Sequence, residues 1–198
     1  MSKTFTVRRA LSAGIAAFAA LSIAACSGSG DEGGHDMDSM ESESTEADFN
    51  DADVSFLQMM IPHHEQAVDM AALAQEHATD VEVIDLAGQI AAAQQPEIDE
   101  MTGLLEEWEQ PLGMEGHEGM SMGGMATEEQ MTELEAAHGV DFDKLFVELM
   151  IAHHEGAVAM AEEHRAGGRN ADAAAIADAV IDTQTAEIAT LQEIQARL

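Results

Sequence analysis

Two short runs of this sequence combine adjacent histidines with methionines in a way that suits a soft metal ion. In each run a His-His pair has one methionine three residues before its first histidine and another seven residues after it. The residues are Met60, His63, His64 and Met70 in the first run and Met150, His153, His154 and Met160 in the second. Thioether sulfur is a soft, uncharged donor that prefers Cu(I) and Ag(I), and imidazole accepts Cu(I) and Cu(II). We therefore predict that these residues bind copper, with Cu(I) favoured and silver as a second candidate.

The two runs belong to one longer duplicated segment. Residues 56–71 return as residues 146–161, and every matched pair is ninety positions apart. The register continues further along the chain, where a Gln-x-x-Glu motif recurs. Its residues are Gln94 and Glu97 in the first copy and Gln184 and Glu187 in the second. A repeat of this kind indicates a duplicated helical unit.

Helical geometry places the histidines on the buried face. At about 100° of turn per residue, His63 and His64 fall on the same side as the apolar residues around them. The Gln-x-x-Glu motif also falls on a core-facing stripe. Buried polar groups are costly unless they form hydrogen bonds or bind a ligand, so the motif is predicted to orient the imidazoles. The expected partners are Glu97 and Glu187, with Gln94 and Gln184 beside them. A hydrogen-bonded network without metal is the alternative interpretation.

The elements that carry these motifs are predicted to be helices. No segment alternates apolar and polar residues with the period of a strand, and alanine is abundant. Helices are expected at residues 51–78, 81–109, 127–138, 141–165 and 171–198. Two helical hairpins with one amphipathic face each bury those faces best against one another. The predicted fold class is therefore all-α, a four-helix bundle built from two repeated hairpins.

The first 26 residues have the features of an export signal. Lys3, Arg8 and Arg9 precede an uncharged apolar run at residues 10–25, which is too short for a comfortable membrane span. The run ends at Cys26 in a pattern that resembles a bacterial lipoprotein signal. That resemblance implies cleavage before Cys26, a lipid attached to it, and a location on the outer face of the cell membrane. An ordinary signal peptide with an incidental cysteine is the alternative.

Composition divides the rest of the chain. Residues 27–50 are rich in Gly, Ser, Asp and Glu and contain little that could be buried, which is typical of a disordered tether. A stretch rich in glycine separates the two copies. The expected organisation is a signal peptide at 1–25, a tether at 26–50 and a bundle at 51–198, made of repeat one at 51–109, a linker at 110–140 and repeat two at 141–198.

The linker carries a further set of soft donors. Because these residues lie among glycines, they cannot be explained as core. They are Met114, His117, Met120, Met122 and Met125. They are predicted as additional metal ligands, with compositional drift as the alternative. The tether repeats the theme with His35, Met37 and Met40.

Charge and cysteine content exclude several classes of function. The chain has 39 acidic and 7 basic residues, a formal net charge of −32. A nucleic-acid-binding protein needs a basic face, so that class is excluded. A single cysteine excludes an internal disulfide framework and a thiolate metal cluster. The acidic surface attracts cations in general, and the sequence does not indicate a protein partner.

The repeated motif resembles a known family. The pattern Met-Ile-x-His-His-x-x-Ala-Val-x-Met-Ala, followed by Gln-x-x-Glu-Ile, is similar to that of the domain-of-unknown-function family numbered 305, over residues 56–108 and 146–198. The resemblance implies a ferritin-like helical bundle, usually exported, and some similar proteins are linked to copper and silver handling. The second copy departs from the first where Leu149 replaces Met59, Ala152 replaces Pro62 and Gly156 replaces Gln66.

Three functions follow from these observations. The main hypothesis is an exported copper-binding lipoprotein that acts in buffering, resistance or delivery. The first alternative is a metal-free helical module whose duplicated face binds a partner. The second is a ferritin-like di-metal oxidoreductase, although the inward carboxylates are only Glu97 and Glu187 and neither has a histidine three residues later.

Overall fold

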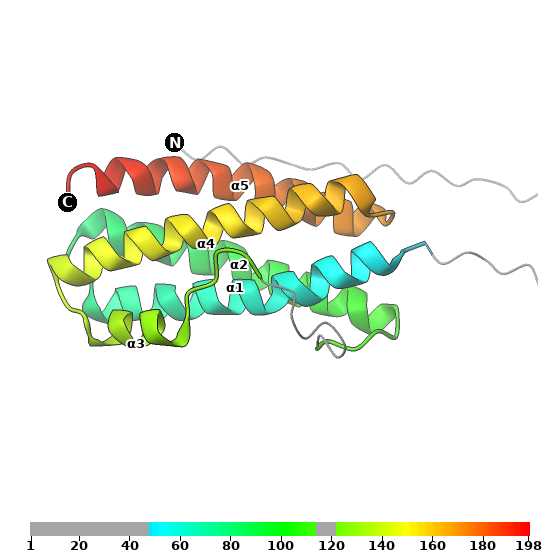
Figure 1. Cartoon of the computed structure of the whole chain (residues 1–198), viewed down its shortest axis with the longest axis horizontal. Coiled ribbons are helices and arrows are strands. Elements are labelled where there is room, and N and C mark those ends of the chain that lie inside the picture. Colours follow the sequence, from blue (N-terminus) through cyan, green and yellow to red (C-terminus); the bar gives the residue numbers. More distant parts are fainter. Residues whose placement is uncertain (1–47, 114–121) are drawn as a thin grey trace, which may run out of the picture. The chain divides into compact units, whose positions relative to one another are not determined.

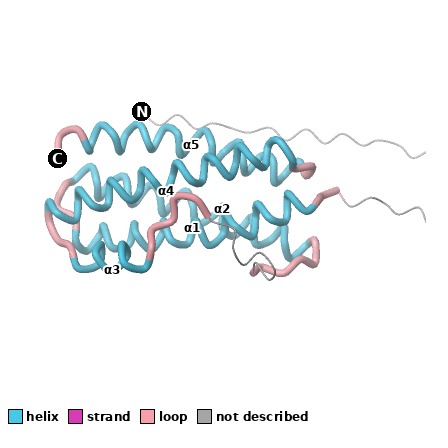
Figure 2. The backbone as a smooth tube through the Cα atoms, viewed as in Figure 1, coloured by secondary structure: helices cyan, strands magenta, loops and turns pink. Residues whose placement is uncertain are grey.

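In the computed structural model of the protein, residues 48–113 and 122–198 are the ones described here. These residues form five helices joined by loops, without a strand among them (Figure 2). The helices are α1 (Asp51–His77), α2 (Val81–Glu107), α3 (Glu128–Ala136), α4 (Val140–Gly167) and α5 (Ala171–Gln195). The all-α prediction is confirmed. The signal peptide, Cys26 and most of the tether, with His35, Met37 and Met40, lie outside the described residues, as do Met114, His117 and Met120.

The four long helices form two hairpins that pack together into a bundle. α1 packs along α2, α4 packs along α5, and α1 and α4 form the main contact between the two hairpins (Figure 1). The short helix α3 lies against α1 and α4. Within the described part of the chain, no helix is long and apolar enough to cross a membrane.

Local sequence determines where the helices begin. The Asn50 side chain accepts hydrogen bonds from the first turn of α1, and Asp80 and Asn170 do the same for α2 and α5. A capping box of Thr127 and Gln130 begins α3, as the sequence indicates. Side chains of this type satisfy backbone N–H groups that have no partner inside the helix.

Two apolar clusters fill the bundle on either side of the histidines. Along α1, Met60 belongs to one cluster and Ala67 to the other, and the first His-His pair lies between them. Along α4, the second pair lies in the same way between Met150 and Ala157. The polar centre is therefore enclosed between two dry regions of core.

Two buried aspartates tie each hairpin to the loop of the other. Asp53 of α1 accepts hydrogen bonds from the backbone N–H groups of Arg169 and Asn170, in the loop before α5. Asp143, ninety residues later, accepts them from the N–H groups of Thr79 and Asp80, in the loop before α2. Burial alone would raise the pKa of Asp53. The hydrogen bonds from the His164 side chain and from neighbouring backbone groups outweigh it, so the net shift of this pKa is downward.

Candidate metal centre

The two His-His pairs meet where α1 crosses α4. All four imidazoles are fully buried. His63 and His153 face each other with ring centroids 3.8 Å apart and ring planes inclined by 42°. The next residue of each pair, His64 or His154, turns toward the second helix of its own hairpin. Residues ninety positions apart in the sequence are thus brought into direct contact.

Three of the four imidazoles are held by an acceptor at Nε2. His64 lies 2.8 Å from the Glu97 carboxylate, and His154 lies 2.8 Å from the Glu187 carboxylate. The corresponding nitrogen of His63 lies 3.1 Å from the backbone carbonyl of Gly123. A carbonyl or carboxylate oxygen only accepts, so each Nε2 carries a proton, and in the neutral form of the ring Nδ1 keeps its lone pair. This is the arrangement that orients metal-binding histidines in proteins.

The unpaired nitrogens are buried without hydrogen-bond partners. Nδ1 has no partner in His63, His64 or His154, and in His153 neither ring nitrogen has one. Both amide atoms of Gln94 and the amide oxygen of Gln184 are also without partners. Of the hydrogen-bonded network that is the alternative to a metal site, the contacts of His64 with Glu97 and of His154 with Glu187 are formed, whereas those atoms of the two glutamines are not paired with the histidines. Buried polar atoms of this kind are rare and need an explanation, and binding of a metal by the nitrogen lone pairs is one.

The protonation state of the facing imidazoles suits metal binding. Burial, together with neighbouring histidines, lowers the pKa of His153 to about 2. Burial lowers the pKa of His63 to about 4, although the Gly123 carbonyl acts in the opposite direction. Both rings are therefore neutral at neutral pH, and the neutral imidazole is the form that binds a metal.

The predicted methionine ligands divide into two groups. Met60 and Met150 are fully buried one turn before His63 and His153. Met70 and Met160 lie seven residues after these histidines, about 10 Å along each helix at a rise of about 1.5 Å per residue. In the described part of the chain, no three His, Cys, Asp or Glu side chains are already grouped to hold a metal ion.

The linker packs over this centre through a pair of glycines. A Cβ at Gly156 of α4 would lie 1.9 Å from the carbonyl oxygen of Gly123, so only glycine fits there. Gly124 has a φ of +84° and also leaves no room for a side chain. From α1, the Gln66 amide both donates to the carbonyl of Ala126 and accepts from its N–H group, at 2.9 and 2.8 Å. Gln66 and Gly156 occupy matching positions in the two repeats, and each of them contacts the linker.

Two linker methionines are within the described residues. Met122 and Met125 are half-buried on either side of the Gly123–Gly124 turn. The turn thus brings part of the methionine-rich linker next to His63. Sequence analysis did not find this contact, although the replacement of Gln66 by Gly156 is a local signal of it.

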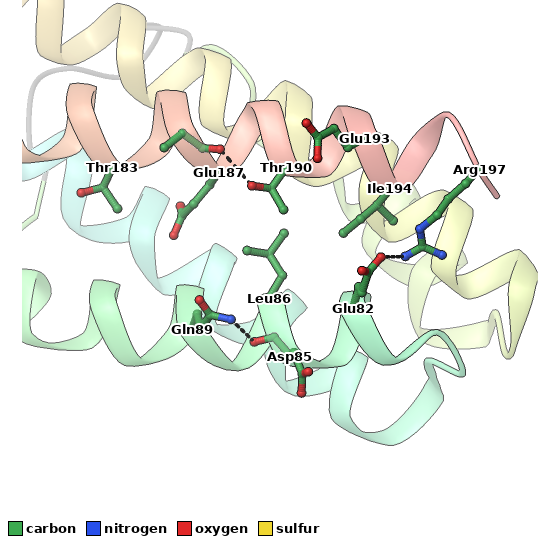
Figure 3. Close-up of a pocket in the computed structure, with 11 residues that line it drawn as sticks. Glu82, Asp85, Leu86, Gln89, Thr183, Glu187, Thr190, Glu193, Ile194 and Arg197 are labelled. Carbon is green, nitrogen blue, oxygen red and sulfur yellow. Dashed lines mark hydrogen bonds and ion pairs between the residues drawn. The ribbon is translucent and has the colours of Figure 1, made fainter.

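A cleft between the other two long helices, α2 and α5, is connected to the histidines by Glu187. It has a volume of about 710 Å³ and lies between α2 and α5 (Figure 3). Its walls carry acidic residues, and Glu187 lines it while also contacting His154. Acidic walls raise the local concentration of cations. The glutamates that orient the imidazoles are also the least buried part of the centre, with the Glu97 side chain 21% exposed.

The sequence and the fold place this protein in a family. The model of the domain of unknown function DUF305 matches residues 53–195, and the chain belongs to that family. No curated protein matches it.

Several solved structures are similar to this chain. A DUF305 protein from Streptomyces coelicolor is 31% identical with a TM-score of 0.70, covering 74% of this chain and 91% of its own. A DUF305 fragment from Deinococcus radiodurans is 32% identical with a TM-score of 0.68, covering 75% and 98%. CopM in its Cu(II)-bound form is 33% identical with a TM-score of 0.63, covering 73% and 96%. CopM has also been solved in Cu(I)-bound, silver-bound and apo forms.

Proposed function

We propose that this protein binds Cu(I) outside the cytoplasm, with silver as an alternative ion, and buffers, sequesters or delivers copper there. The observation that carries the proposal is the set of buried Nδ1 atoms without partners, on imidazoles whose Nε2 atoms are already held. Similarity to CopM, a protein solved with copper and with silver, supports the same ion.

The ligands follow from the donor chemistry. His63 and His153 supply facing nitrogens, His64 and His154 lie next to them, and the thioethers of Met60 and Met150 lie one turn away. Nitrogen and thioether sulfur together suit Cu(I). Glu97 and Glu187 orient the imidazoles and increase their basicity. Met122 and Met125, with the other linker methionines, would deliver or hold further ions.

The proposed location rests on the N-terminal sequence. The apolar run that ends at Cys26 is the pattern of a lipoprotein signal, and the Streptomyces coelicolor relative is named as a candidate secreted protein. An oxidising compartment also favours methionine over cysteine as the sulfur ligand, because thiols form disulfides there. A lipid anchor on Cys26 would keep the bundle at the membrane.

The proposal is tested by a Cu(I) competition titration of the mature chain against a chromogenic chelator. We expect the His63→Gln/His153→Gln variant to bind Cu(I) more than about tenfold more weakly, since loss of an orienting partner alone costs ten- to a hundredfold. Met131→Leu on α3 is the control and should bind like the wild type. A metal-free module would show no retention of Cu(I) in the wild type, and unchanged affinity in the double variant would refute the assigned ligands.

A further inference from the structure

We propose a second soft-metal site, separate from the histidine pairs, where the N-terminal end of α1 lies beside the C-terminal end of α4 (Figure 1). A cavity of about 470 Å³ opens there, which we call the end cavity. Its lining includes Asp51, Met59, Met160, Glu163 and His164. We infer that Met59, Met160 and His164 bind Cu(I) or Ag(I) in it.

The His164 side chain is built like the imidazoles of the central site. It is only 3% exposed, and its Nε2 donates to the buried carboxylate of Asp53 over 2.8 Å. Its Nδ1 is buried and has no hydrogen-bond partner. A carboxylate on one nitrogen and an unpaired lone pair on the other is the arrangement of a metal-binding histidine. Because Nε2 is occupied, Nδ1 is the nitrogen available to a ligand.

The residues at the matching positions of the other repeat, at the opposite end of the bundle, provide a comparison for the end cavity. The positions that match Met59, Met160 and His164 in the other repeat are Leu149, Met70 and Ala74. These three are buried together in an apolar cluster. Packing alone is therefore satisfied by leucine and alanine at these positions.

Met59 and His164, the two proposed ligands that differ from their matches in the other repeat, line the same cavity. Met59 and His164 are 105 positions apart in the sequence, yet both line the end cavity. Asp143, the match of Asp53, is satisfied by Thr79 and Asp80 and does not need a histidine. His164 is therefore not needed to satisfy the Asp53 carboxylate, and it lines the same cavity as Met59.

The donors select a soft monovalent ion. Two thioethers and one imidazole are neutral and polarisable, and they favour Cu(I) or Ag(I) over hard cations, which need several oxygen ligands. Asp51 and Glu163 line the same cavity and attract a cation to it. His164 follows His153 by eleven residues, about 16 Å along α4 at about 1.5 Å per residue, so the two sites do not share a ligand.

The chain itself supplies the variant that tests this site. Met59→Leu/His164→Ala gives the end cavity the residues of the other repeat, and Asp53 keeps its backbone N–H donors, as Asp143 does without a histidine. The mature protein is titrated with Ag(I), and the bound equivalents are counted by mass spectrometry under native conditions. We expect one equivalent fewer than in the wild type, and no change in the control Met131→Leu. An unchanged count would overturn the second site.

A spectroscopic measurement identifies the ligands and separates this site from the central one. Methionine methyl groups are labelled with ¹³C, and Ag(I) is added to the His63→Gln/His153→Gln variant. We expect the Met59 and Met160 methyl resonances to shift, and the shifts to vanish when Met59→Leu/His164→Ala is added. Loss of an equivalent in the central variant alone, with the Met59 and Met160 signals unmoved by Ag(I), would refute the end site and leave the central one standing.

Discussion

The two hairpins surround equivalent histidines in different ways. In the first, the linker carbonyl of Gly123 holds His63, whereas His153 in the second has no hydrogen-bond partner. The hairpins also contact the linker in different ways. Gln66 forms hydrogen bonds with it, whereas Gly156 has no side chain and lets the linker backbone pack closely. Duplication thus gives two equivalent helical hairpins. The one linker between them contacts each hairpin differently, so the surroundings of His63 and His153 are not equivalent.

The largest expected effect is at the buried aspartates. Asp53→Ala and Asp143→Ala each leave at least two backbone N–H groups without an acceptor, and at about 1–3 kcal/mol for each group each variant should lower the free energy of unfolding by about 2–5 kcal/mol. Asp53→Ala should cost more because it also leaves His164 unpaired. Urea denaturation measures both. Asp85→Ala at an exposed position is the control, with an expected change within about 0.5 kcal/mol. Equal losses in all three variants would show that the buried aspartates do not hold the two loops.

Acid should destabilise the metal-free protein through the facing histidines. Their pKa values are about 4 and about 2 in the folded state, against about 6.5 in the unfolded chain. The unfolded state therefore binds more protons below pH 6.5, and the free energy of unfolding falls as the pH decreases. The slope that each histidine contributes should approach about 1.4 kcal/mol per pH unit as the pH falls from 6 to 5.

The contributions of His63 and His153 to the pH dependence of stability should differ at lower pH. His63 stops contributing near pH 4, where its folded form takes up a proton, while His153 continues below it. We therefore expect His63→Gln and His153→Gln to flatten the slope equally above pH 5, and only His153→Gln to flatten it below pH 4. Stability measured by denaturation from pH 7 to 3.5 checks this, with Met131→Leu as the unchanged control. Equal slopes in all variants would contradict the assigned burial.

Gly156→Ala should release the linker. The added methyl group would overlap the Gly123 carbonyl, and overpacking of this kind costs about 1–3 kcal/mol. Gly103→Ala on α2 is the matched control, since nothing lies within 4 Å of its Cβ, and it should stabilise the helix by about 0.5–1 kcal/mol. Hydrogen exchange of the Ala126 N–H group, which is held by Gln66, should become faster only in Gly156→Ala. Slow exchange in both variants would show that the linker does not depend on this contact.

The smallest effect is expected at the other linker contact. Gln66→Ala removes two hydrogen bonds to Ala126 and should lower the free energy of unfolding by about 1–2 kcal/mol. Gln75→Ala on the same helix removes one exposed hydrogen bond and should change it by less than about 0.5 kcal/mol. Denaturation of the two variants side by side measures the difference. Equal values would show that Gln66 does not hold the linker in solution.

Local sequence was enough to predict the helices and the faces they bury. The expected second helix at 81–109 is found as Val81–Glu107, and the expected helix at 141–165 is found as Val140–Gly167. The start of the first of these follows from the Asp80 cap, and both follow from the period of the apolar positions, which acts over a few residues. The ninety-residue register likewise indicated that each His-His pair faces a Gln-x-x-Glu motif, and the structure places His64 on Glu97 and His154 on Glu187.

Only the tertiary structure could decide which distant residues meet. The contact of His63 with Gly123 spans 60 residues, and that of His164 with Asp53 spans 111. Neither has a local period, because each depends on how the hairpins and the linker pack together. The sequence by itself determined a duplicated, histidine-bearing helical frame. Packing of the two copies determined that His63 is held, that His153 is left without a partner, and that Met59 and His164 share a cavity, because these contacts form only when the hairpins and the linker dock.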